Sequence, residues 1–237
     1  MKLSLLNHSG FLLDDGHRAY VFDYFKDPAG LVKKAQAEGR ELWFFATHLH
    51  GDHYSPRILD FNTPTTKYIV HEDVPKEGLP TDRTTFMAVG DETTIDGVKI
   101  TMYGSTDEGG SFLLTFPNLT VFHAGDLNWW HWLGDTDENN RFAREYARKE
   151  FNRVQGMKAD VVMFPVDARL EAAREWGPIE FLHHVEQPKL FVPMHANGPI
   201  WEPSIYFKAL YEDLPLWIPQ HDGDTTDLKP YETAQQG

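Results

Sequence analysis

Three histidines and an aspartate lie close together in the segment Thr47-His48-Leu49-His50-Gly51-Asp52-His53. Clustered imidazoles would repel one another when protonated, and their nitrogens would lack partners when buried. A metal ion removes both problems, because neutral imidazoles and carboxylates are ligands that zinc and similar ions prefer. The residue types therefore predict a metal site, and the alternative is a coincidental polar loop.

The elements around this segment predict how it is positioned. The apolar residues 42–46 indicate a buried strand, and Ser55-Pro56 is typical of a helix start. The histidines thus follow a strand end, where sheets flanked by helices form ligand sites. His48 and His50 are two residues apart, so they point the same way in an extended chain.

The pattern His48-x-His50-x-Asp52-His53 resembles the metal motif of the metallo-β-lactamase superfamily. The resemblance implies an α+β fold, namely a four-layer αββα sandwich of two mixed β-sheets packed face to face with helices outside. The chain length is typical of a single domain over residues 1–237, and the alternative is two closely fused halves. Within the superfamily, the chain looks most like the cytoplasmic branch that includes ascorbate-phosphate lactonase.

Two later segments match the same resemblance in the expected order. His123-Ala124-Gly125-Asp126 follows a predicted hairpin, and His195 follows a predicted strand at residues 189–194. The resemblance implies that Asp126 bridges two metals and that Asp52 or Asp126 orients the nucleophile. The implied metal ligands are His48, His50, Asp52, His53, Asp126 and His195.

One loop departs from the superfamily pattern. The superfamily usually has a further histidine ligand here, but residues 105–108 read Ser-Thr-Asp-Glu. Asp107 is a candidate replacement, and its oxygen would favour manganese or iron over zinc. Alternatively, the first metal site is incomplete, or only one ion binds.

Three further residues have open roles. Asp23 ends an early predicted strand; the resemblance implies that it supports the metal loop, and the alternative is a turn cap. His123 is a site residue, a substrate contact or a packed histidine. His131 lies among three tryptophans in residues 129–132, as a proton donor or a surface group, and this segment forms a pocket wall or a core plug.

Other elements are predicted from patterning. Strands are expected at residues 2–6, 11–14, 19–23 and 216–218, and a helix at residues 28–38. A helix over residues 138–155 should pack as core or lid through a stripe of Phe142, Tyr146, either Ala147 or Glu150, Phe151 and Val154. Asp167 and Arg169 are expected to form a loop salt bridge. The polar residues after 220 should fray.

Composition narrows the function classes. The 237 residues are 41% hydrophobic and 14% aromatic, as in a folded globule. There is no cysteine, which excludes disulfides and thiolate ligands. The net charge of −14 argues against a nucleic-acid partner. No signal peptide or membrane span is visible, so the cytoplasm is expected and no membrane partner; the oligomeric state is open.

Together these observations predict a metal-dependent hydrolase acting on a small soluble substrate. One or two Zn²⁺ ions are expected, with Mn²⁺ or Fe as alternatives. A metal-activated hydroxide would attack an ester, lactone, amide or phosphodiester. The alternatives are a mononuclear iron oxygenase or redox enzyme on the same fold, and a catalytically idle metal-binding protein.

Overall fold

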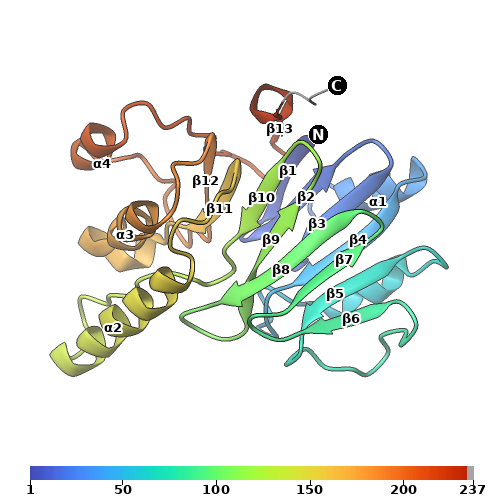
Figure 1. Ribbon diagram of the computed structural model, residues 1–237, viewed down its shortest axis with the longest axis horizontal. Coiled ribbons are helices and arrows are strands. Elements are labelled where there is room, and N and C mark those ends of the chain that lie inside the picture. Colours follow the sequence, from blue (N-terminus) through green and yellow to red (C-terminus); the bar gives the residue numbers. More distant parts are fainter. Residues whose placement is uncertain (234–237) are drawn as a thin grey trace. The chain divides into compact units, whose positions relative to one another are not determined.

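The computed structural model describes residues 1–233, which divide into two compact units. Unit 1 comprises Met1–Val89 and Pro219–Pro230, and unit 2 comprises Gly90–Ile218 with residues 231–233. Each unit contains one β-sheet with its own helices (Figure 1). This division does not test the expected single domain over residues 1–237, which stays a prediction.

The sheet of unit 1 has the strand order β13-β1-β2-β3-β4-β5-β6. β13, β1, β2 and β3 are antiparallel neighbours, whereas β3 to β6 are parallel. The elements are β1 (Lys2–Asn7), β2 (Gly10–Asp14), β3 (Arg18–Phe22), α1 (Leu31–Ala37), β4 (Glu41–Ala46), the 3₁₀ helix η1 (Pro56–Phe61), β5 (Lys67–His71), β6 (Thr84–Met87), β13 (Thr225–Asp227) and, at the C-terminal boundary, η3 (Lys229–Tyr231).

β4 shows why the centre of this sheet is stable. It lies between the parallel strands β3 and β5, and every residue after Glu41 is buried. A parallel strand covered on both faces has a continuous apolar sequence, which explains Leu-Trp-Phe-Phe-Ala here. Leu42 and Phe44 share an apolar cluster with Val32 and Ala35 of α1. The strand that precedes the histidine loop is therefore rigidly held.

The sheet of unit 2 has the strand order β12-β11-β10-β9-β8-β7. β10, β11 and β12 are parallel, whereas β7 to β10 are antiparallel neighbours. The elements are β7 (Glu92–Ile95), β8 (Val98–Gly104), β9 (Gly110–Thr115), β10 (Thr120–His123), α2 (Asp137–Arg153), β11 (Val161–Pro165), the 3₁₀ helix η2 (Ala168–Ala173), α3 (Trp176–His184), β12 (Leu190–Met194) and α4 (Ile205–Leu210).

Most predicted elements are confirmed, with two shorter helices. α1 begins at Leu31 and not at residue 28, because Gly30 before it has a φ of 68° and the Asp27 carboxylate accepts the first helical N–H groups. The helix after the histidine loop begins as predicted, with Ser55 as its cap, but it is the short 3₁₀ helix η1 and not an α-helix.

Three predictions were wrong. Phe142, the first residue of the predicted α2 stripe, is 70% exposed, whereas Ala147, Glu150, Phe151 and Val154 of the same stripe are buried as predicted. The polar tail does not fray throughout, since Thr225–Asp227 pairs with β1. Residues 216–218 form no strand; Leu216 makes only one isolated bridge, to Phe191. Within residues 1–233, no helix has the length and apolar composition needed to cross a membrane.

Candidate metal centre

The histidine loop of unit 1 lies at one edge of its sheet. The register of β2, β3 and β4 aligns Phe11, Phe22 and Phe45. Because β2 begins where β3 and β4 end, Asp23 and the turn at residues 7–10 come to the same edge as the loop. Strand pairing therefore brings together residues that are far apart in the sequence.

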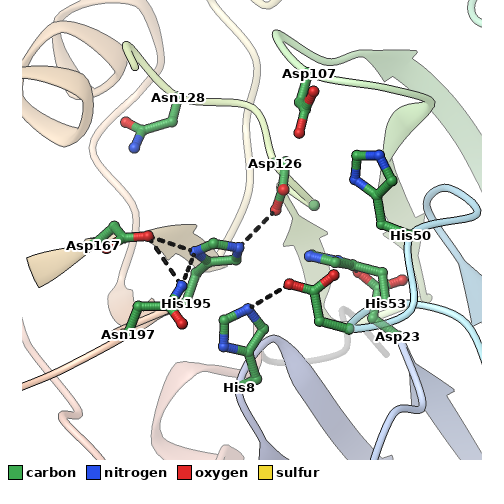
Figure 2. A network of polar contacts seen from close by, with 12 residues as sticks. His8, Asp23, His50, His53, Asp107, Asp126, Asn128, Asp167, His195 and Asn197 are labelled. Carbon is green, nitrogen blue, oxygen red and sulfur yellow. Dashed lines mark hydrogen bonds and ion pairs between the residues drawn. The ribbon is translucent and has the colours of Figure 1, made fainter. Parts of the chain in front are cut away.

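Asp23 is a fully buried hydrogen-bond acceptor behind this loop. Its Oδ1 accepts the Thr47 backbone N–H at 2.8 Å, and its Oδ2 accepts the Thr47 hydroxyl at 2.8 Å. Oδ2 also lies 2.7 Å from Nδ1 of His53. Asp23 therefore anchors the first residue of the loop and orients the His53 ring (Figure 2).

These bonds determine which nitrogen of each ring carries the proton. The carboxylate of Asp23 can only accept, so Nδ1 of His53 donates and Nε2 carries the lone pair. The Thr47 hydroxyl donates to Asp23, so it accepts from Nδ1 of His48 at 3.0 Å. His48 consequently also carries its lone pair on Nε2. A metal-ligating histidine is usually oriented in this way by an acceptor on its other nitrogen.

The remaining residues of the loop cluster with these two rings. Nε2 of His48 lies 3.1 Å from Nδ1 of His50, and the His48 and His53 ring centroids are 4.1 Å apart. Nε2 of His8 lies 3.4 Å from a carboxylate oxygen of Asp52. This hydrogen bond from His8 holds the pKa of Asp52 well below its usual range, so Asp52 is a carboxylate at neutral pH.

His8 was missed by the sequence analysis. It lies in the β1–β2 turn with a φ of 57°, and one ligand atom each of His8, Asp52 and His53 lie within 4.8 Å of one another. The signal in the sequence was a histidine in a strand–turn–strand segment, next to Ser9-Gly10. A β-turn histidine has no distinctive spacing, so the pattern alone could not assign it.

Unit 2 has a second cluster at the carboxyl ends of its parallel strands. The register pairs His123 of β10 with Met163 of β11, and Pro165 of β11 with Met194 of β12. The residues that follow these strands therefore share one edge of the sheet. They are Asp126 after β10, Asp167 after β11, and His195 with Asn197 after β12.

Asp167 orients the His195 ring as Asp23 orients the His53 ring, by accepting a hydrogen bond from Nδ1. It is fully buried, and its Oδ2 lies 3.0 Å from Nδ1 of His195 and accepts from Nδ2 of Asn197 at 3.1 Å (Figure 2). Burial alone would raise the pKa of Asp167, but the hydrogen bonds from His195 and Arg169 hold it well below its usual range. The expected Asp167–Arg169 salt bridge is confirmed at 2.6 Å, whereas its link to His195 was missed.

Asp126 and His195 face each other within unit 2. Because Nδ1 of His195 donates to Asp167, its Nε2 carries the lone pair, and this atom lies 3.5 Å from Oδ1 of Asp126. Two acceptor atoms at this distance repel unless a proton or a cation lies between them. A carboxylate and a neutral imidazole are a donor set that fits a divalent transition metal. Trp130 supports both, through its Nε1 hydrogen bond to the Asp126 carbonyl and its ring against His195.

The loop without the expected histidine is tied to Asp126. The Thr106 hydroxyl accepts the Asn128 N–H at 2.8 Å and donates to the Asn128 carbonyl at 2.6 Å. Asp107, which is exposed, and Asp126 each offer an oxygen, and these two atoms lie within 4.8 Å of each other. Asp107 is therefore positioned as the sequence hypothesis requires, and its role as a ligand stays a prediction.

His123 and His131, the two other histidines predicted as possible site residues, have different surroundings. His123 is fully buried, and its Nδ1 accepts the Gly125 N–H at 3.2 Å, which stabilises the turn before Asp126. His131 packs on Trp176 with ring centroids 4.5 Å apart. The tryptophan segment therefore divides: Trp130 contacts His195, and Trp129 belongs to another group of rings with Trp176.

Backbone strain concentrates at the two clusters. In the described chain, six non-glycine residues have positive φ, and four of them are cluster residues: His8 at 57°, Asp23 at 44°, His195 at 56° and Asn197 at 42°. Each such residue costs about 1–3 kcal/mol and persists where the surroundings enforce it, commonly at functional sites. The four strained residues are also residues whose side chains form the polar contacts described above.

Comparisons with solved structures identify the fold. Igni18, a metallo hydrolase from the archaeon Ignicoccus hospitalis, matches with a TM-score of 0.63 at 18% identity, over 95% of this chain and 97% of its own. YhfI from Bacillus subtilis, a metallo-β-lactamase fold protein, matches with 0.55 at 13% identity, over 95% and 99%. CmlA from Streptomyces venezuelae, a diiron β-hydroxylase, matches with 0.54 at 13% identity, over 82% and 44%.

The chain therefore has the metallo-β-lactamase fold, and the predicted α+β class with two mixed sheets is confirmed. No protein-family model and no curated protein matches the sequence. At these identities the likeness concerns the fold alone. The resemblance to the ascorbate-phosphate lactonase branch stays a prediction.

Proposed function

We propose that the protein is a metal-dependent hydrolase. The observation that carries this proposal is that three histidines, His48, His53 and His195, have their tautomers set by a hydrogen-bond acceptor on Nδ1. Each ring therefore presents the Nε2 lone pair that a metal requires. Buried structural histidines need no such uniform arrangement in both units.

The proposed ligands are those predicted from the sequence, shared between the two clusters. His48, His50, Asp52 and His53 come from unit 1, and Asp126 and His195 come from unit 2. The support is the order of the motifs along the chain, the fold and the donor chemistry of each cluster. Zinc is the expected ion, and manganese or iron would suit a site with Asp107.

The chain's own residues have distinct roles in this mechanism. A bound divalent cation supplies Lewis-acid chemistry and lowers the pKa of water. Asp52, held as a carboxylate by His8, accepts a proton or hydrogen bond from the attacking water. Asp126 is the alternative carboxylate for orienting the water, and Asp23 and Asp167 keep the rings in place. The substrate is a small ester, lactone, amide or phosphodiester.

Turnover on a substrate panel tests this proposal. The protein with zinc or manganese should hydrolyse at least one of these four bond types, and Asp52→Asn should lower kcat by about 10²–10⁴-fold. Asp60→Asn is the matched control, because Asp60 is a 69% exposed carboxylate on η1. If nothing is hydrolysed, the idle metal-binding protein replaces the hydrolase; if Asp52→Asn turns over as fast as wild type, Asp52 is not the catalytic carboxylate.

A second candidate function is an iron-dependent oxygenase. The observation that favours it is the oxygen-rich loop at residues 105–108, whose Asp107 lies near Asp126. The fold of this chain is compatible with such a function, because the diiron β-hydroxylase CmlA has a similar fold. Iron in the purified protein, together with oxygen consumption that requires iron, would support this function over hydrolysis.

A further inference from the structure

A cavity of about 410 Å³ lies in unit 2, between the segment after Asp126 and the helices α2 and α3. Its volume is within the range of about 300–1,000 Å³ typical of small-molecule sites. Three rings and three cations dominate its lining: Trp129, His131, Trp176, Arg141, Arg144 and Arg148. None of these residues is a proposed metal ligand.

The rings provide flat surfaces at one side of this cavity. Trp129 and Trp176 have centroids 5.3 Å apart, and His131 lies 4.5 Å from Trp176. Trp176 is 38% exposed although it is a large apolar residue. The Arg148 guanidinium lies 6.0 Å from the Trp129 ring centroid, so the rings and the cations adjoin each other. The exposed part of Trp176 is suited to stacking with another planar ring.

The cations come from successive turns of α2. Arg141, Arg144 and Arg148 are spaced three and four residues apart, so they lie on one face of the helix. Arg144 has only a 3.4 Å ion pair with its neighbour Glu145, and its buried Nε has no acceptor among the described residues. Arg141 forms no ion pair in the described part of the chain, and Arg148 reaches Glu180 at 3.4 Å.

The local charge is opposite to that of the chain. Among the lining residues only Asp137 is acidic, whereas the chain as a whole carries a net charge of −14. Asn140 also lines the cavity, but its side chain is occupied by the backbone of Trp132. A local excess of arginine in an acidic protein attracts anions to this cavity.

We propose that this cavity binds a small organic anion, a planar ring that carries a carboxylate or phosphate. The ring stacks on Trp129 and Trp176, and the anionic group accepts hydrogen bonds from the arginines of α2. Guanidinium groups match the geometry of carboxylate and phosphate oxygens, which accounts for three arginines where a lysine would provide charge alone.

Isothermal titration and tryptophan fluorescence with four probes test the proposal on the protein as purified. Benzoate and phenyl phosphate should bind, and their comparison distinguishes the two anionic groups. Benzamide, a neutral ring, should bind at least about tenfold more weakly because it lacks the charged hydrogen bond, and inorganic phosphate should do so because it lacks the stacking ring.

Variants locate the binding. Arg144→Gln and Trp176→Ala should each weaken benzoate or phenyl phosphate about tenfold or more, and Arg144→Lys should have an intermediate effect. Lys149→Gln, an exposed cation of α2 outside the cavity, should change nothing. His195→Ala should retain binding, because the cavity does not include the proposed metal ligands.

Three results would overturn the proposal. These are the absence of binding at millimolar probe, equal binding of benzamide, and unchanged binding in folded Arg144→Gln and Trp176→Ala proteins. Loss of binding in His195→Ala would also overturn it, because the probe would then occupy the metal centre. The titrations test the cavity site and the turnover assay tests the hydrolase, so either proposal can fail while the other holds.

Discussion

Two buried aspartates determine what the histidines of this protein can do. Asp23 accepts from Thr47 and His53, and Asp167 accepts from His195, Asn197 and Arg169. Neither aspartate is a proposed metal ligand. Each sets the proton position on a ring, and the ring then offers Nε2 to an ion.

Asp23→Asn should weaken metal binding about 10–100-fold, the usual effect of removing a partner of a ligating histidine. The amide cannot accept on both atoms, so either the Thr47 contact or the His53 contact is lost. Competition with a chromogenic chelator measures the affinity, and Asp82→Asn, whose side chain is 77% exposed, is the control. Unchanged affinity in the folded variant would show that Asp23 only caps the turn.

At the residue scale, the sequence predicted the candidate metal ligands better than the residues that hold those ligands in place. Local spacing predicted His48, His50, Asp52 and His53 as ligands because residues close in sequence are close in space, and their role as ligands stays a prediction. His8 and the Asp167–His195 contact depend on strand register, with 28 residues between Asp167 and His195. No local pattern encodes such pairings.

The elements place the clusters through strand ends and one close helix contact. α3 approaches the segment after β10 so closely that a Cβ on Gly177 would overlap Oδ1 of Asn128 and lie 2.9 Å from the Trp129 backbone nitrogen. Asn128 is fully buried and follows Asp126 by two residues. Gly177 therefore allows the helix to brace the Asp126 turn.

Gly177→Ala should reverse the usual effect of this substitution. Alanine in a helix normally stabilises by up to about 1 kcal/mol over glycine. Here the clash with Asn128 should destabilise the protein by about 1–3 kcal/mol. Urea unfolding measures the change, with Gly134→Ala as control because nothing lies within 4 Å of its added Cβ. Equal or greater stability of Gly177→Ala would refute the bracing role.

Element boundaries followed from the sequence where a cap or turn was specific. Ser55 caps a helix, as predicted. The pattern did not separate a 3₁₀ from an α-helix, because both begin alike. It also missed β13, since Thr225–Asp227 is polar and is stabilised by pairing with β1.

At the scale of the whole molecule, the fold was predictable and the substrate was not. The resemblance of the histidine motif to the superfamily, with the later motifs in the expected order, predicted the metallo-β-lactamase fold, and the pattern of strands and helices was consistent with it. A fold shared by hydrolases and a hydroxylase does not determine the reaction. The charge of −14 and the cationic cavity of unit 2 instead constrain what can approach.

We expect the histidine clusters of both units to bind metal. Elemental mass spectrometry on protein purified without added metal, with His53→Ala, His195→Ala and the 83% exposed His221→Ala as control, tests this expectation most directly. We predict one or two ions per wild-type and His221→Ala chain, and fewer in both other variants. No metal even after soaking, or full metal content in folded His53→Ala and His195→Ala, would contradict the account.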